Sequence, residues 1–302
     1  MQMTHRTSAP PPQRSPLPWP SIVRQAIVCG ITCLSWTAGA ADGGPWMRLP
    51  PAPPLPPTHV SGYASVDGVR LFYAEFGKGR PVLLLHGGLA NSNYWGYVIP
   101  ILVRHHFKVI ALDSRGHGRS TRTAEPYSYA RMADDVIAVL DYLQLHRVDM
   151  VGWSDGGIIG LYIAMHHPER LRRLYAYGAN ADPTGVKDVG DSLTFQQYLE
   201  QTRADYAALS PSPQDYDALR AQIEAMWTGQ PDFTSDAMHR ITARTAIADG
   251  AYDEAIKREH TEYLAQAIPG ATLVILPDVS HFGMLQNPKE FAASVVKFLT
   301  AP

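Results

Sequence analysis

Apolar and polar residues alternate in blocks along residues 60–300, and this pattern predicts strands that take turns with helices. Alternating apolar positions on both sides of Asp67-Gly68, a strong turn signal, predict a β-hairpin. Helices are predicted over residues 129–143, 157–165 and 288–299. Short, largely apolar runs of the kind found in buried strands occur at residues 81–85, 107–112, 148–153, 171–178, 243–248 and 272–276. Strand, helix and strand in repetition imply the α/β class, with a mostly parallel central sheet flanked by helices.

Residues 182–240 break this rhythm, because they contain amphipathic stretches but no convincing strand. The stretches cover residues 195–209 and 215–227, and prolines separate them. An insertion of this kind between two core strands predicts a helical cap. We expect the cap to lie over the carboxyl ends of the strands, where open α/β sheets bind their ligands.

The first forty residues predict an export signal. Their only formal charges are three arginines, and an apolar run at residues 26–37 precedes the small residues 38–40. This order is typical of a signal peptide, and the run is short for a bilayer span. We expect residues 1–40 to be removed and the mature protein to be periplasmic or secreted, with a retained N-terminal anchor as the alternative.

A proline-rich linker is expected next, over residues 41–58. Proline-rich chain of this kind is extended, so we do not expect the linker to fold. The folded domain should then cover residues 59–302, with the cap inserted at about residues 182–240.

The charge balance of the chain argues against nucleic acid or an anionic membrane as a partner. The formal net charge is −2 and the isoelectric point is near 6.6. Removal of the three arginines of the signal would change the net charge from −2 to −5. The two cysteines, Cys29 and Cys33, lie inside the signal. The mature protein would therefore hold neither a disulfide nor a thiolate metal site.

Ser154 lies in Gly152-Trp153-Ser154-Asp155-Gly156, a G-x-S-x-G sequence between a predicted strand and a predicted helix. A five-residue pattern with two free positions also arises by chance. The strand before it and the helix after it favour a nucleophile turn, in which a strained backbone presents the serine hydroxyl and neighbouring backbone leaves no room for a Cβ at the glycines. The N-terminus of the helix would stabilise a negative oxygen beside Ser154.

A serine nucleophile needs a base, and the base needs a carboxylate. His281 follows the last predicted strand and should lie level with Ser154, so we predict it as the general base. The loop after the preceding strand offers Asp249, Asp253 and Glu254. Asp253 is far enough past the strand end to reach His281 and is our choice, whereas Asp249 is expected to organise the turn.

An oxyanion hole needs two backbone donors, which we expect to be the amides of Gly88 and Asp155, with the Leu89 amide as the next choice. We also expect Leu89, Trp153 and Trp227 to contact the substrate. The cap residues Phe195, Tyr198, Met226 and Trp227 are candidates for an apolar pocket, with packing inside the cap as the alternative for each of them.

These motifs resemble those of the α/β-hydrolase fold family over about residues 60–300. The stretch from GWSDGG to Gly178-Ala179-Asn180 also resembles the group of aminoacyl-ester hydrolases typified by valacyclovir hydrolase. The family resemblance implies a structural role for Arg115 and His117 at the rim of the site. It rests on LLLHGG at 83–88, DSRGHGRS at 113–120, GWSDGG at 152–157, DGAYDE at 249–254 and SHF at 280–282.

We therefore expect an exported serine hydrolase that cleaves small carboxylic esters through an acyl-enzyme on Ser154, without metal or organic cofactor. The same three residues are also compatible with hydrolysis of carbon–carbon bonds or lactones, or with perhydrolysis. A ligand-binding protein with little turnover is the alternative from another class. The Asp155 side chain has two readings: a carboxylate that selects cationic amino-acid esters, or an acid that meets the helix dipole. The sequence favours the second reading.

Overall fold

An eight-stranded sheet forms the centre of the computed structural model, which describes residues 43–58 and 60–302. The predicted signal, residues 1–40, lies outside the described residues. The strands are ordered β1-β2-β4-β3-β5-β6-β7-β8; β1 and β2 run antiparallel to their neighbours, and the other pairs are parallel. The predicted α/β class with a mostly parallel sheet is confirmed.

The strands agree closely with the apolar runs of the sequence. Asp67 and Gly68 both have positive φ, 40° and 77°, and form the hairpin turn that the sequence predicts between the first two strands. The strands are β1 (Val60–Val66), β2 (Val69–Phe76), β3 (Arg80–Leu85), β4 (Phe107–Leu112), β5 (Val148–Trp153), β6 (Leu171–Tyr177), β7 (Arg244–Gly250) and β8 (Thr272–Leu276).

Helices fill the connections between the strands. The sequence pattern did not indicate the helix that follows β7. The α-helices are α1 (Ile99–Arg104), α2 (Tyr129–Tyr142), α3 (Asp155–His166), α4 (Leu193–Leu209), α5 (Tyr216–Gly229), α6 (Ser235–His239), α7 (Arg258–Ala267), α8 (Gly283–Gln286) and α9 (Pro288–Thr300).

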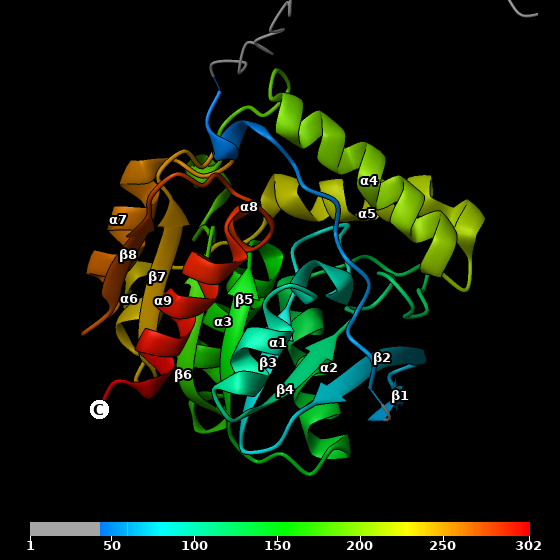
Figure 1. Ribbon diagram of the computed structural model, residues 1–302, viewed down its shortest axis with the longest axis horizontal. Coiled ribbons are helices and arrows are strands. Elements are labelled where there is room, and N and C mark those ends of the chain that lie inside the picture. Colours follow the sequence, from blue (N-terminus) through cyan, green and yellow to red (C-terminus); the bar gives the residue numbers. More distant parts are fainter. Residues whose placement is uncertain (1–42, 59) are drawn as a thin grey trace, which may run out of the picture. The chain divides into compact units, whose positions relative to one another are not determined.

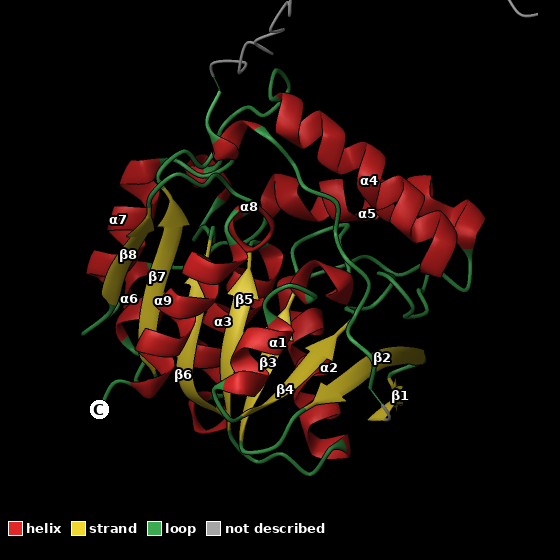
Figure 2. Cartoon of the chain, in the orientation of Figure 1, coloured by secondary structure: helices red, strands yellow, loops and turns green. Residues whose placement is uncertain are grey.

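The two faces of the sheet bury two separate apolar clusters, because successive side chains of a strand point to opposite faces. In β3, Leu83 and Leu85 belong to the cluster that contains residues of α2 and α3. Val82 and Leu84 belong to the cluster that contains residues of α1 and α9. The central strands are thus covered on both faces, and the layers can be followed in Figure 1 and, coloured by element type, in Figure 2. A sheet buried on both faces explains why its strands read as continuous apolar runs.

The segment between β6 and β7 is helical and lies over the carboxyl ends of the parallel strands. Its two long helices, α4 and α5, lie above the arrowheads of the sheet in Figure 1. Short 3₁₀ turns, Pro183–Gly185 and Pro213–Asp215, precede these helices at prolines. The cap therefore covers the edge of the sheet at which β5 ends and Ser154 follows.

Residues 45–58, called the strap below, differ from the expected unfolded linker. Beyond the 3₁₀ turn Pro45–Met47 the strap is drawn as loop in Figure 2, but its side chains pack on the domain. Leu49, Ala52 and Leu55 contact the cluster around α1 and α9. The Trp46 ring stacks on Tyr252 with centroids 3.7 Å apart. Apolar residues between the prolines give an extended chain something to bury, which composition alone does not reveal.

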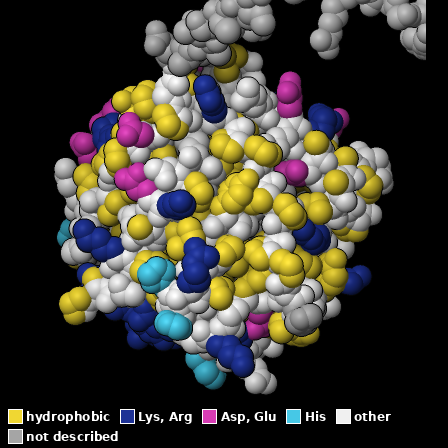
Figure 3. Space-filling view, in the orientation of Figure 1, with side chains coloured by type: hydrophobic (Ala, Val, Ile, Leu, Met, Phe, Trp, Pro, Cys, Tyr) yellow, Lys and Arg dark blue, Asp and Glu magenta, His cyan; other side chains and the backbone are white. Residues whose placement is uncertain are grey.

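The surface mixes charges of both signs with apolar side chains. Figure 3 shows one face, on which Lys and Arg, Asp and Glu, and His are interspersed among apolar groups. Throughout residues 43–58 and 60–302, each helix falls short of the length and apolar character that a bilayer crossing requires.

Candidate active site

Ser154 lies at a sharp turn between β5 and α3, and its backbone is strained. Its φ is 53° and its ψ is −119°, a conformation that side-chain-bearing residues rarely adopt. A Cβ on Gly152 would lie 2.2 Å from the Gly156 carbonyl oxygen, and one on Gly156 would lie 2.1 Å from that of Leu85. The two glycines of the motif therefore allow the close approach of backbone that the turn needs.

His281 and Asp253 come together from neighbouring loops, after β8 and β7. The distance from His281 Nδ1 to Asp253 Oδ2 is 2.7 Å, and both side chains are buried. Asp253 Oδ1 also accepts from the amides of Ala255 and Ile256, at 2.6 and 2.7 Å. An ionised carboxylate only accepts, so Nδ1 of His281 carries the hydrogen and Nε2 is the free base.

Burial and charge act in opposite directions on this pair. Burial lowers the pKa of His281, but the Asp253 carboxylate and its hydrogen bond raise it by more, so the pKa lies above the ordinary 6.5. Burial raises the pKa of Asp253, but the positive charge and hydrogen bond of His281 outweigh it and hold that pKa well below 3.8. The pair therefore favours a charged imidazolium once a proton arrives.

Aromatic rings and a glycine enclose the His281 imidazole. The ring centroids of Trp153 and Phe195 both lie 5.8 Å from that of His281. Gly178, at the end of β6, has φ +61°, and a Cβ there would lie 2.8 Å from His281 Cε1. Any side chain at position 178 would push the imidazole out of place.

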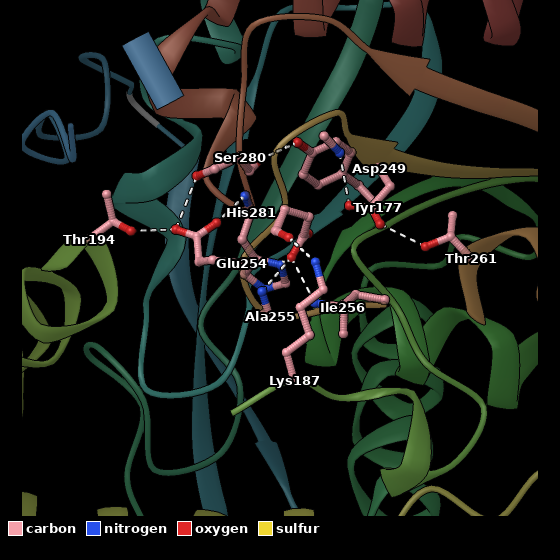
Figure 4. Close-up of polar contacts among 12 residues, drawn as sticks. Tyr177, Lys187, Thr194, Asp249, Glu254, Ala255, Ile256, Thr261, Ser280 and His281 are labelled. Carbon is pink, nitrogen blue, oxygen red and sulfur yellow. Dashed lines mark hydrogen bonds and ion pairs between the residues drawn. The ribbon is translucent and has the colours of Figure 1, made fainter. Parts of the chain in front are cut away.

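Asp249, the second choice for the acid, lies elsewhere. Its Oδ1 accepts from the Gly250 amide at 2.8 Å, and its Oδ2 accepts from the Thr261 hydroxyl at 2.6 Å. Burial, and then the neighbouring Asp253 charge, raise the pKa of Asp249 well above 3.8. Asp249 is thus a buried acid at the turn, hydrogen-bonded to Thr261 of α7 rather than to His281 (Figure 4).

Ser154 and His281 line one cavity of about 450 Å³ beneath the cap. Across the described parts of the chain, no hydrogen bond joins the Ser154 hydroxyl to His281. Such contacts are often long until substrate binds. The other residues that line the cavity are Gly88, Tyr129, Trp153, Asp155, Asn180, Pro183, Val186, Lys187, Asp188, Val189, Phe195, Tyr198, Glu224, Trp227, Thr228, Gln230, Ala255 and Ile256.

Two candidate pocket residues, Leu89 and Met226, are not among those that line the cavity. Leu89 has φ +66°, and its side chain is 2% exposed and packs in the core against the sheet. Met226 is 3% exposed and belongs to the same apolar cluster. Trp153 and Trp227 line the cavity, as do Phe195 and Tyr198.

Asp155 begins α3, so its amide is a free donor at the helix N-terminus, beside Gly88 on the cavity wall. Its carboxylate accepts from the Tyr129 hydroxyl at 2.8 Å and from Trp227 Nε1 at 2.9 and 3.1 Å. Burial raises the pKa of Asp155 to about 6, although these two hydrogen bonds lower it. The protein itself thus supplies donors to the carboxylate.

Arg115 and His117 are both buried behind the site. Arg115 donates to both oxygens of Asp135, each at 2.5 Å, and His117 Nδ1 lies 2.8 Å from the Arg115 carbonyl oxygen. Burial lowers the pKa of His117 to about 3, so its ring is neutral. These contacts hold the loop after β4, as the family resemblance implied.

Several contacts of the site carry no local sequence signal. Tyr129 reaches Asp155 from α2, and the Tyr198 hydroxyl donates to the Gly88 carbonyl from the cap. Lys187 Nζ donates to the Asp253 carbonyl at 2.6 Å, and its amide donates to the Ala255 carbonyl at 2.7 Å. Each partner is distant in sequence, so only the fold identifies it.

The turn at Ser154, the His281 imidazole and the cap define the site, and comparisons with known proteins identify the class of protein. A family model described as the alpha/beta hydrolase fold matches residues 80–220. The non-heme chloroperoxidase CPO-A1 of Kitasatospora aureofaciens is 30% identical over 270 residues, which are 77% of this chain and 97% of that protein. The chain belongs to the α/β-hydrolase fold family, a family of hydrolytic enzymes.

Other relatives carry hydrolase names. Serine hydrolase BPHL of Mus musculus is 28% identical over 261 residues, which are 80% of this chain and 86% of that protein. The solved structure of the esterase EaEST from Exiguobacterium antarcticum has a TM-score of 0.64 and 25% identity, and the match covers 80% of this chain and 99% of that one.

Proposed function

We propose that this protein hydrolyses carboxylic esters through an acyl-enzyme on Ser154. The observation that carries the proposal is a single cavity lined by a strained serine and by an imidazole whose Nδ1 is bonded to Asp253 at 2.7 Å. This is the arrangement that converts a weak hydroxyl nucleophile into an effective one.

In the proposed mechanism, the Ser154 oxygen attacks the ester carbonyl carbon while His281 Nε2 takes the hydroxyl proton. The amides of Gly88 and Asp155 donate to the oxyanion. The imidazolium then gives its proton to the departing alcohol, which leaves an ester bond between the acyl group and Ser154. Water, deprotonated by His281, attacks this ester and releases the acid, and the proton returns to Ser154.

The cavity favours a small-molecule substrate with both apolar and polar groups, because its lining contains both kinds of side chain. Aromatic cap residues, Phe195, Tyr198 and Trp227, give it an apolar wall. Because Tyr129 and Trp227 already bond the Asp155 carboxylate, we propose that this acid supports the site and does not select cationic amino-acid esters.

Perhydrolysis is the second activity to assay, since a 30% identical relative is named a chloroperoxidase. Hydrogen peroxide in place of water would attack the same acyl-enzyme, giving a peracid and free Ser154. This route uses the same residues and needs only a different nucleophile.

We also propose export, from the signal pattern of residues 1–40. Expression of the full chain in a bacterium should yield a mature protein that begins near position 41 in the periplasm or medium. A full-length protein that stays with the cells would contradict export and leave the proposed chemistry standing.

The proposed activity is tested with nitrophenyl esters of increasing acyl length beside amino-acid esters, on wild type and Ser154→Ala. We expect saturable hydrolysis by wild type, and a kcat lower by about 10⁴- to 10⁶-fold in the variant. Activity that survives in a folded Ser154→Ala protein would refute the role of Ser154.

A further inference from the structure

The carboxylate of Glu254 joins three parts of the molecule at the edge of the active site. Glu254 directly follows Asp253 and is half-buried. Its Oε2 accepts from the backbone amide of His281 at 3.0 Å. Its Oε1 accepts from the hydroxyls of Ser280, at 3.2 Å, and Thr194, at 2.5 Å (Figure 4). Thr194 belongs to α4, so one side chain links the acid loop, the base loop and the cap.

The bond to the His281 amide differs from the bond to its ring. Asp253 holds Nδ1 of the imidazole, whereas Glu254 holds the main chain from which the imidazole projects. The neighbouring Ser280 is held as well, by Gln286 Oε1 on its amide at 2.7 Å and by the Tyr177 hydroxyl on its carbonyl at 2.5 Å. Asp253 thus holds the ring of His281 and Glu254 holds its backbone, and both acids belong to the same loop.

Glu254 also adds negative charge near the imidazole. The charged groups that act most on His281 are three acids, Asp253 and Glu254 from the loop after β7 and Asp155 from α3. The ammonium group of Lys187, which lines the same cavity, is bonded to the Asp253 carbonyl at 2.6 Å. Burial lowers the pKa of His281, and Asp253, followed by Glu254 and Asp155, raises it. Loss of the Glu254 charge should therefore lower the pKa of His281.

We infer that Glu254 is a positioning residue that fixes the backbone of His281 relative to Asp253 and ties it to the cap through Thr194. Glu254 does not line the cavity of about 450 Å³, so it acts through His281 and not on the substrate. The role as stated rests on the proposed function, because it assumes that His281 is the base.

Three variants separate the functions of the carboxylate. Glu254→Ala removes the acceptor of the His281 amide, and we expect kcat to fall about tenfold or more, with little change in KM, because small displacements of a catalytic group are costly. Glu254→Gln keeps an acceptor but loses the charge, so kcat should fall less while the acid limb of the pH–rate profile moves to lower pH. Thr194→Val removes the link to the cap, together with the 2.9 Å contact between the Thr194 and Ser192 hydroxyls, and should have the smallest effect on kcat.

The deciding measurement is the titration of His281 by NMR in wild type and Glu254→Gln, with folding checked by circular dichroism. We expect a lower pKa in the variant, which a role in stability alone would not produce. An unchanged His281 titration together with wild-type kcat in Glu254→Gln would overturn the inference. If Glu254→Ala does not fold, Glu254→Gln decides.

The outcome is separable from that of the proposed function, because the NMR titration needs no substrate. A wild-type protein that hydrolyses no ester would contradict the proposed function. A lower His281 pKa in Glu254→Gln would even then support the contact between Glu254 and His281.

Discussion

The two walls of the cavity are built differently. On the wall formed by the sheet, the main chain places Ser154 and His281. Ser154 lies at a strained turn after β5, and the backbone amides of Ser280 and His281 donate to the side chains of Gln286 and Glu254. On the cap wall, Phe195 and Trp227 project from helices that touch the catalytic loops mainly through side chains. In the proposed function, the sheet wall carries the chemistry and the cap wall shapes what can enter.

The walls meet at two bonds close to the expected oxyanion hole. Trp227 donates to the Asp155 carboxylate, and Tyr198 donates to the Gly88 carbonyl. A cap residue thus touches each loop that we expect to supply an oxyanion donor. Changes on the sheet wall should therefore affect kcat strongly, and changes on the cap wall should affect kcat and KM moderately.

The largest contrast is expected within the sheet wall, between Asp253→Asn and Asp249→Asn. Asp253→Asn should lower kcat by about 10⁴-fold, because the amide no longer holds the correct tautomer of His281. Asp249 contacts Gly250 and Thr261, and its Asn variant keeps a similar shape, so kcat should change less than about tenfold. Steady-state kinetics of both variants decide the matter: a collapse in Asp249→Asn alone would make Asp249 the acid.

The pH dependence of kcat/KM should be set by His281 on the sheet wall. His281 acts as a base only when neutral, and its pKa is raised above 6.5. We therefore expect kcat/KM to rise with pH through a midpoint above 6.5 and to fall about tenfold per pH unit below that midpoint. A profile measured on a neutral ester that stays flat well below pH 6.5 would argue against His281 as the base.

A smaller effect is expected where the walls meet. Asp155→Asn removes the charge of the acceptor in the hydrogen bond from Trp227, and Trp227→Phe removes its donor, so each should lower kcat/KM by about tenfold. Neutral and amino-acid esters should lose equally, and the double variant should lose less than the product of the single effects. A loss confined to amino-acid esters in Asp155→Asn would show that the carboxylate selects a cation.

The smallest effect is expected in the strap, which lies on neither wall. Trp46→Ala removes the ring stacked on Tyr252 and should lower the free energy of unfolding by about 1 kcal/mol, with kcat nearly unchanged. Met47, 56% exposed in the same turn, provides the matched control, and Met47→Ala should alter neither quantity. Chemical denaturation gives the free energy of unfolding, and steady-state kinetics give kcat. Equal stability of Trp46→Ala and wild type would reduce the strap to a passive linker.

The sequence predicted the sheet wall better than the cap wall. The bounds of β4, β5 and β8 agree with the apolar runs at 107–112, 148–153 and 272–276. For β4 and β5 the reason is burial on both faces of the sheet, which requires largely apolar strands. Helix α7 escaped notice because only a few of its side chains are buried, Thr261 and Leu264 among them. The helix is also largely polar in composition, so few apolar residues mark its buried face.

Within the candidate site, too, some residues could be predicted from the local sequence and others could not. Asp253 could be chosen over Asp249 from its distance past the strand end, and the structure brings Asp253 to His281. The bond from Tyr129 to Asp155 and the core position of Leu89 depend on how distant elements pack. Local pattern contains no information on such partners, which is why the pocket was predicted less well than the loops that carry the candidate triad.

The proposed hydrolysis depends most on a covalent bond to the hydroxyl oxygen of Ser154. Treatment of the folded wild-type protein with a fluorophosphonate probe, followed by peptide mass spectrometry, tests it directly. We predict a single adduct on the peptide that contains Ser154, which is absent in Ser154→Ala and forms far more slowly in His281→Ala. An unlabelled wild-type protein, or an adduct on another residue, would contradict the account.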